Sequence, residues 1–238
     1  MDITLENAKK QRVLKKLSWN MRITGWISPY LIYVFSKLSI DPFIITFTWV
    51  LLSFVGFYFI ALGPYTYAVI GIVIYHIALL LDSTDGGVAR MLNKTNAAGE
   101  FCDRFFSTLN RFLILLVMGI GLYRTRNEIF FLYLGIWCGS LVLLDNFTKM
   151  KRYESLINSK RLDLIKDLDD KNKNTKTDWK FHLVELFRPA NHFTLSFFAI
   201  IFGLTEYYLY VFSVLVLFQF LISFYKVFVS LKNTAQNL

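Results

Sequence analysis

The feature that most constrains this chain is a long stretch without charge. Between Pro42 and Leu81 there is no Lys, Arg, Asp or Glu, and the dipeptide Gly63-Pro64 interrupts the stretch near its middle. A helix needs about 20 apolar residues to cross the hydrocarbon core of a bilayer, and a Gly-Pro pair is a turn signal. The stretch therefore predicts two transmembrane helices joined by a tight turn.

The composition supports a membrane protein. Apolar residues (AVILMFWYC) make up 55% of the chain and charged residues 18%, whereas about 25% of a soluble domain is charged. A shorter uncharged stretch, Ile23–Ser36, contains Pro29 and predicts a helix in the membrane interface. The expected fold class is therefore an all-α integral membrane protein with six transmembrane helices plus an N-terminal interfacial helix. Beyond the first two, the expected spans are Phe105–Tyr123, Ile129–Leu144, His192–Leu204 and Tyr207–Tyr225.

The basic residues predict an orientation. The net charge is +9, and the Lys and Arg residues gather before the first span and between the fourth and fifth. By the positive-inside rule both regions are cytoplasmic, and because these clusters flank spans, nucleic acid is not expected as a partner. We expect a multi-pass protein with both termini and the active site on the cytoplasmic side. Residues 1–40 form a cytoplasmic or interfacial segment, and residues 41–238 a transmembrane domain with a cytoplasmic loop at about 148–190.

Acidic residues break the apolar pattern at one membrane edge. Asp82 and Asp85 lie near the end of the second span, and Asp103 lies near the start of the third. An acid at a helix centre costs roughly 2.5–3.5 kcal/mol on insertion scales, so acids in spans are functional candidates. Three carboxylates with Arg90 nearby suit Mg²⁺ or Mn²⁺ holding a pyrophosphate. The structural alternative is a buried network of ion pairs between the two helices.

Small residues accompany these acids. Gly86 and Ala89 leave room for a bulky group to approach the backbone, and Arg90 has the planar geometry that suits phosphate oxygens. Gly99 is expected to let the third span pack closely against the second. Together these residues predict a phosphate-binding site at the cytoplasmic end of the two helices.

The whole segment resembles the signature of the CDP-alcohol phosphotransferases (CDP-alcohol phosphatidyltransferases), D-x2-D-G-x2-A-R-x8-G-x3-D-x3-D. The chain reads Asp82-x2-Asp85-Gly86-x2-Ala89-Arg90-x8-Gly99-x3-Asp103, so seven of the eight fixed positions match with every spacing kept. A partial match to the family's P-N-x-x-T occurs at Asp41-Pro42-Phe43-Ile44-Ile45-Thr46. There, Asp41 and Pro42 are also explained as the N-cap and first residue of a helix.

The resemblance implies a function. Such enzymes move a substituted phosphate from a CDP-linked alcohol, often CDP-diacylglycerol, to a hydroxyl acceptor and release CMP. They act in phospholipid biosynthesis and work in contact with the membrane lipid. The resemblance also implies a homodimer. The metal ligands that it implies are Asp82, Asp85 and Asp103, and the nucleotide-binding residues are Asp82, Gly86, Ala89, Arg90 and Gly99.

The chain departs from the signature at Ser107, where the family has its last aspartate. That residue is thought to act in the family as metal ligand and general base. A serine hydroxyl is a poor base at neutral pH, so either another group replaces the aspartate or the reaction is slow or lost. Glu100, Asp103, Ser107 and Arg111 lie on one helical stripe, so Glu100 is a candidate replacement and completes a catalytic set with Asp103 and Ser107. Glu100 is also explained as a helix-start acid favoured by the dipole.

Basic residues are candidate contacts to a phosphate on the acceptor. Arg111 either receives such a phosphate, neutralises the carboxylates or serves as a structural counterion. Lys149, Arg152 and Arg188 are further candidates, although cytoplasmic Lys and Arg at helix ends are expected in any case. Asp145 is placed to pair with Lys149 at i, i+4.

Three function classes stay open. The first is an active CDP-alcohol transferase, and the second is a catalytically impaired relative that binds nucleotide, metal or a partner. The third is a different membrane enzyme with Asp-rich Mg–pyrophosphate chemistry, such as an intramembrane prenyltransferase. The Gly86-x2-Ala89-Arg90 element favours the first class over the third, and an activity measurement separates the first from the second.

Overall fold

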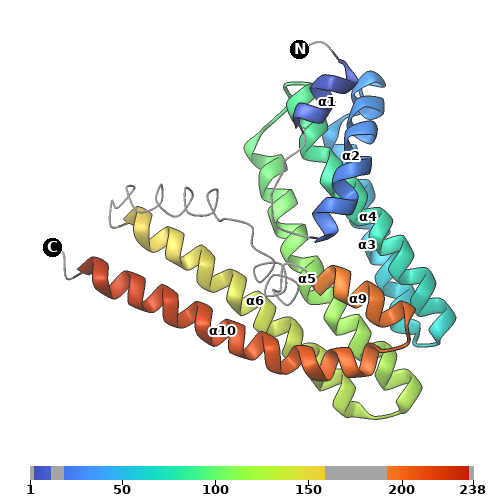
Figure 1. Ribbon diagram of the computed structural model, residues 1–238, viewed down its shortest axis with the longest axis vertical. Helices are drawn as coiled ribbons and strands as arrows, with labels where there is room; N and C mark the ends of the chain where they lie inside the picture. The colour runs from blue at the N-terminus through green and yellow to red at the C-terminus, as the bar shows by residue number, and fades with distance from the viewer. Residues whose placement is uncertain (1–2, 12–18, 159–191, 236–238) are drawn as a thin grey trace.

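The computed structural model describes residues 3–11, 19–158 and 192–235, and every regular element within these ranges is a helix (Figure 1). The predicted all-α fold is therefore confirmed. The helices are α1 (Leu5–Gln11), α2 (Trp19–Lys37), α3 (Pro42–Leu62), α4 (Tyr65–Met91), α5 (Ala97–Arg126), α6 (Ile129–Asn158), α9 (His192–Ile201) and α10 (Thr205–Ala235).

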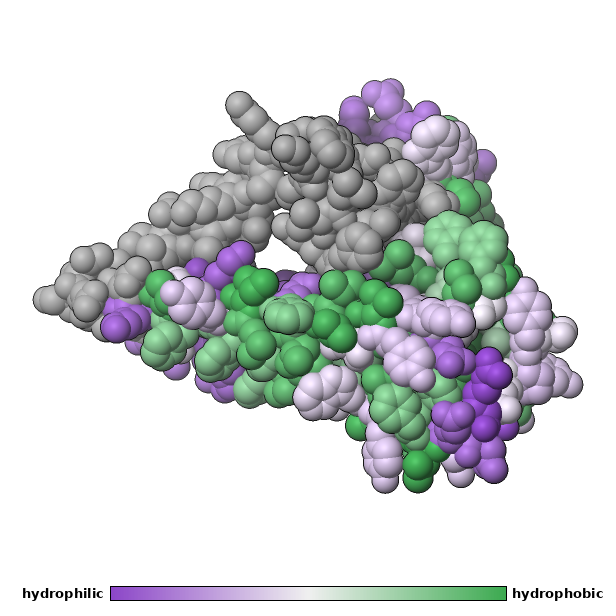
Figure 2. All heavy atoms as spheres, turned by 60° about the horizontal axis from the view of Figure 1, so that its bottom comes forward, coloured by the Kyte–Doolittle hydropathy of each residue, from purple (hydrophilic) through white to green (hydrophobic). Residues whose placement is uncertain are grey.

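Five helices are long and apolar enough to cross a membrane: α3, α4, α5, α6 and α10. Large hydrophobic side chains cover much of the surface, and Figure 2 shows a face on which they dominate while hydrophilic groups gather near its margins. The protein is thus a multi-pass membrane protein. The fifth expected span, His192–Leu204, coincides with α9, an apolar helix of 10 residues. Residues 159–191 before it lie outside the described ranges, so the number six stays a prediction.

The start of α3 follows from local chemistry. Asp41 is the N-cap, as predicted, and its Oδ1 accepts a hydrogen bond of 2.9 Å from the backbone N–H of Phe43. Pro42 is the first residue of the helix. A backbone N–H at this position would have no acceptor within the helix, so the N–H that proline lacks is not needed there. At the far end Gly63 adopts φ 102°, a conformation that favours glycine. The predicted tight turn between the first two spans is therefore present.

Glycines set how closely the helices cross. A Cβ added to Gly71 of α4 would lie 2.5 Å from the carbonyl oxygen of Gly56 in α3, and a Cβ on Gly119 of α5 would lie 2.9 Å from the Cα of Gly135 in α6. Such close approach lets two backbones touch, which is how many membrane helices associate. The pairs α3–α4 and α5–α6 are accordingly the most extensive helix contacts.

One packing prediction was wrong. The helix α3 packs against both α4 and α5, whereas α4 and α5 contact each other little. A Cβ added to Gly99 would meet only the Asn96 side chain, at 3.4 Å, so this glycine does not mediate a close helix crossing. Gly99 instead lies in the first turn of α5, where its N–H donates to the N-cap Asn96.

The predicted interfacial helix and the predicted cytoplasmic loop have boundaries that differ from those of the observed helices. α2 spans the predicted interfacial stretch and packs against α4. α6 runs on to Asn158, through the first part of the segment expected as a cytoplasmic loop, because its polar residues continue the helical pattern. The rest of that loop lies outside the described ranges. Figure 1 shows α6 and α10 side by side, diverging from the other helices towards their far ends.

Candidate functional site

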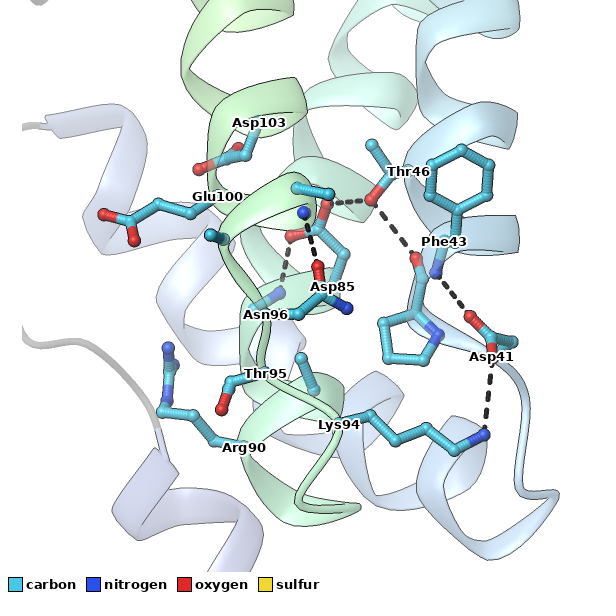
Figure 3. A pocket seen from close by; sticks show the side chains of 16 residues that line it. Asp41, Phe43, Thr46, Asp85, Arg90, Lys94, Thr95, Asn96, Glu100 and Asp103 are labelled. Carbon is cyan, nitrogen blue, oxygen red and sulfur yellow. Dashed lines mark hydrogen bonds and ion pairs between the residues drawn. The ribbon is translucent and has the colours of Figure 1, made fainter.

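A cavity of about 1000 Å³ opens where α3 and α5 begin and α4 ends (Figure 3). Its size is at the upper end of the range for ligand pockets. Six of the residues that line it belong to the motif identified in the sequence: Asp85, Gly86, Ala89, Arg90, Gly99 and Asp103. The structure therefore brings the two halves of the motif, from α4 and α5, to one cavity.

Asp85 is held by α3. Its Oδ2 accepts hydrogen bonds from the Thr46 hydroxyl at 2.8 Å and from the Trp49 indole N–H at 3.0 Å, and Figure 3 shows Thr46 pointing towards it. The carboxylate is 6% exposed. Two donors from one helix therefore fix the orientation of a carboxylate on another, as outer partners do for ligating carboxylates.

Asp82 connects α4 to α5. The Ser107 hydroxyl donates to its Oδ1 over 3.4 Å, and its side chain also shares a hydrogen bond with that of Asp103. Two carboxyl groups share such a bond only with a proton between them, and a cation is the other way to bring them together. Ser107 therefore sits beside the acids, at the place that its position in the signature implies.

The donor chemistry fits a divalent cation. In the described part of the chain there is no group of three or more His, Cys, Asp or Glu side chains close enough to hold an ion by itself. Mg²⁺, however, usually binds through one or two carboxylates together with substrate phosphates and water. The adjoining carboxyl groups of Asp82 and Asp103 meet that description at the edge of a cavity large enough for a nucleotide.

Arg90 is engaged by the N-terminal helix. Its Nη2 donates to the backbone oxygen of Gln11 at 2.8 Å and its Nε to the Gln11 side chain at 3.3 Å. Ala8 of α1 is fully buried against Ile32 and Val88, which docks α1 beside the cavity. Nothing in the sequence indicated this contact, because it joins residues that are far apart in the chain.

Two ion pairs border the cavity. Lys94 pairs with Asp41 at 3.3 Å across the entrance. The Phe43 backbone N–H, with a smaller contribution from Lys94, lowers the pKa of the Asp41 carboxyl. Glu100 lines the cavity, but its exposed carboxylate pairs with Arg104 one turn along α5.

Arg111 lies deeper, between three helices. Its Nη1 donates to the Asn146 side chain at 3.3 Å, and the charges of Asp82 and Asp145 act on it. Asp145 also pairs with Lys149 at 2.5 Å, which confirms the expected i, i+4 pair. Arg111 and Lys149 are thus brought together through Asp145.

The remaining two predicted acceptor contacts are Arg152 and Arg188. Arg152 donates to the hydroxyl of Ser230 at 2.8 Å and so links α6 to α10. Arg188 lies outside the described residues. Within the described residues, Arg152 is not among those that line the cavity.

Sequence reasoning missed the residues that position Asp85. Thr46 closes the partial match Pro42–Thr46, which was available as a signal, but the N-cap at Asp41 explained that segment on its own. Trp49 carried no signal beyond its place on the same helical face as Thr46. Tyr75, fully buried in α4 and electrostatically coupled to Asp82 and Arg111, also read as an ordinary aromatic residue of a span.

Comparison with known proteins supplies an independent result. The sequence model of the CDP-alcohol phosphatidyltransferase family matches residues 40–229. The match begins just before α3, ends within α10 and so includes every carboxylate described above. A search of curated proteins finds no match.

Proposed function

The chain belongs to the CDP-alcohol phosphatidyltransferase family, and we propose that it moves a substituted phosphate from a CDP-linked alcohol to a hydroxyl acceptor and releases CMP. The observation that carries this proposal is the cavity, because motif residues from two helices line it together. The family acts in phospholipid synthesis and generally depends on a divalent metal. CDP-diacylglycerol is the donor we favour, since the cavity opens in a protein surrounded by lipid.

The three carboxylates of the motif bind the metal ion in this proposal. Asp82 and Asp103 would hold the divalent cation, Mg²⁺ or Mn²⁺, together with the donor. Asp85 would complete the ligands in the orientation that Thr46 and Trp49 give it. When bound, the ion supplies positive charge that stabilises the CMP leaving group.

The nucleotide lies against small residues. A Cβ on Gly86 would meet only the Arg90 side chain, at 3.4 Å, so the backbone there is open to a ligand. Ala89 and Gly99 line the same cavity. Arg90 binds a donor phosphate, and Gln11 shares or yields its hydrogen bonds when the donor enters.

The acceptor hydroxyl attacks the phosphorus next to the CMP group. Asp103 and Ser107 lie beside Asp82 and orient the reacting groups. Glu100 is the carboxylate that the helical stripe offers in place of the missing aspartate, and it acts there only if it leaves Arg104. For a phosphorylated acceptor, Arg111 and Lys149 are the nearer candidate contacts and Arg152 is more remote, while Arg188 stays a candidate from the sequence alone.

The second candidate function is binding of nucleotide and metal without efficient transfer. Ser107 favours it, because a serine is a poor base. In either case we propose that the site faces the cytoplasm, where the basic segments place it, and that the protein forms homodimers as the resemblance implies.

Titration of purified protein with CMP and Mn²⁺ tests the donor site. We expect saturable CMP binding that needs Mn²⁺ and that Asp85→Asn weakens at least tenfold, because the amide keeps a hydrogen-bond acceptor but removes the charge. Glu154→Gln is the matched control, since that carboxylate is exposed on α6 and pairs only with Lys151 among the contacts described for it.

A product assay separates the two candidates. Labelled CDP-diacylglycerol is offered with a pool of polyol acceptors, beside the Asp103→Ala variant. Mn²⁺-dependent binding with product supports the transferase, and binding with no product above that of Asp103→Ala supports the non-catalytic candidate. Failure to bind CMP under any metal condition contradicts both.

A further inference from the structure

Three side chains near the candidate site each carry a buried polar atom without a hydrogen-bond partner in the described part of the chain. Within the described residues, no hydrogen-bond partner is present for the Tyr75 hydroxyl, the Arg111 Nε or the Asp145 Oδ1. Tyr75 is fully buried and Asp145 is 2% exposed. Since the great majority of buried polar atoms in proteins are paired, three unpaired atoms on residues that interact electrostatically through Arg111 favour a polar ligand.

The three residues come from three helices and converge on Arg111. Tyr75 of α4 and Asp145 of α6 both act electrostatically on the Arg111 guanidinium of α5, as does Asp82. Asn146, the neighbour of Asp145, accepts a hydrogen bond from the same guanidinium. This cluster therefore adjoins Asp82, and through it Ser107.

The donor or acceptor character of the three unpaired atoms indicates what kind of ligand would fit them. Arg111 Nε–H is a donor, Asp145 Oδ1 is an acceptor and the Tyr75 hydroxyl is both. An alcohol hydroxyl needs one acceptor for its proton and one or two donors for its lone pairs, so it matches this set. We propose that Tyr75, Arg111 and Asp145 form the subsite for the acceptor hydroxyl, and that Asp145 is the base that replaces the carboxylate absent at Ser107. This inference rests on the proposed transferase function.

The proposed step is balanced. The acceptor O–H bond breaks and its proton goes to Asp145 Oδ1, while the oxygen forms a bond to the phosphorus that bears the transferred alcohol. The bond from that phosphorus to the bridging oxygen of CMP breaks, and CMP leaves with the electron pair. Lys149 stays on Asp145 Oδ2 at 2.5 Å, which leaves Oδ1 for the acceptor.

The geometry favours Asp145 over Glu100 for this role. The Glu100 side chain is 63% exposed and is paired with Arg104, so it lies in the solvent-facing part of α5. Asp145 is buried, its Oδ1 has no partner among the described contacts, and its charge acts on Arg111, one helical turn beyond Ser107.

A rescue experiment tests the inference. CMP release from CDP-diacylglycerol is measured with Mn²⁺, using water and glycerol as the hydroxyl acceptors. Asp145→Asn should lower kcat about 100-fold or more, the usual contribution of a general base, and leave CMP binding within twofold. Adding Ser107→Asp to Asp145→Asn should recover at least tenfold, because a carboxylate returns to the other side of the acceptor. Glu154→Gln, an acid-to-amide change elsewhere on α6, should match the wild type.

The outcomes separate this inference from the proposed function. Loss of activity in Asp145→Asn with intact CMP binding and recovery by Ser107→Asp supports it, and a purely structural role for Asp145 predicts no such recovery. Asp145→Asn with more than a third of wild-type turnover overturns it. Wild-type protein that binds CMP yet releases none from the donor also overturns it, because a working base is then missing. Wild-type protein that does not bind CMP contradicts the proposed function itself.

Discussion

At the scale of single residues, the candidate site depends on hydrogen bonds that its motif does not contain. Asp85 belongs to the motif, but both donors to its Oδ2 come from α3. Without them the carboxylate could turn among several rotamers, and each productive contact would cost ordering entropy. The Thr46 and Trp49 donors therefore give Asp85 one direction before any ligand enters.

Thr46→Val tests this positioning role. Valine has the shape of threonine but no hydroxyl, so Asp85 loses a 2.8 Å hydrogen bond without a cavity being formed. Outer partners of metal ligands typically contribute 10–100-fold in affinity. We expect Mn²⁺-dependent CMP binding, measured by titration, to weaken about tenfold. The variant Thr46→Ser keeps the hydroxyl and should bind CMP as the wild type does.

The neighbouring Thr48 supplies the control. Its hydroxyl donates to the carbonyl of Ile44 in its own helix and faces outward. Thr48→Val should therefore bind CMP as the wild type does. Equal loss in Thr46→Val and Thr48→Val, or no loss in either, would contradict the positioning role.

At the scale of elements, the apolar pattern and the caps were sufficient to predict most helices. The charge-free stretch and Gly63 predicted α3 and α4, and Asp41 with Pro42 predicted where α3 begins. Such features are local, because a helix in lipid satisfies its backbone hydrogen bonds within itself. The polar continuation of α6 to Asn158 was missed for the converse reason: beyond the apolar stretch, hydropathy no longer marks the helix.

Contacts between helices could not be predicted in the same way. Gly99 was assigned to a close crossing of the second and third spans, and the crossing glycines are instead Gly56 with Gly71 and Gly119 with Gly135. The motif spacing fixed which acids share a site, but not that α3 would hold Asp85 or that Asp145 would approach Arg111. Those facts depend on crossing angles, which a single sequence does not state.

The α3–α4 crossing gives a stability prediction. Gly71→Ala places a methyl group 2.5 Å from a backbone oxygen and 2.8 Å from the Ile60 backbone nitrogen, so the helices must separate. Overpacking of this kind typically costs about 1–3 kcal/mol, which for a chain of this length lowers Tm by roughly 2–12 °C. Thermal unfolding in detergent measures it.

Val73→Ala is the control for that measurement, because Val73 lies two residues away on the same helix with its side chain 43% exposed. We expect its Tm to stay within about 2 °C of the wild type, as for most surface changes. A Gly71→Ala protein as stable as Val73→Ala would show that the crossing tolerates a side chain and that the glycine contact is not tight in the membrane.

At the scale of the whole molecule, the cavity and the basic residues predict the same orientation. The cavity lies at the end where α4 stops and α5 begins, and Lys94 borders it there. The opposite ends of these helices turn at Gly63 and at Asn127. Since most Lys and Arg of the sequence belong to the segments at the cavity end, the positive-inside rule predicts that this end faces the cytoplasm, the compartment in which nucleotides are abundant.

Cysteine labelling tests the orientation. In a background with Cys102→Ser and Cys138→Ala, one variant carries Thr95→Cys, in the loop at the cavity, and another carries Glu128→Cys, in the turn between α5 and α6. Both positions are exposed. A membrane-impermeant maleimide added to intact cells should label Glu128→Cys and leave Thr95→Cys unlabelled until the membrane is opened.

The reverse pattern would contradict both the orientation and its physical basis. A cavity on the outer face would have to take its donor from a compartment poor in nucleotides, and its cationic surroundings would oppose the positive-inside rule. Labelling of both positions in intact cells would mean that the chain inserts in two directions. In that case the cluster of Lys and Arg does not set the topology, because a charge bias strong enough to orient the helices permits one direction only.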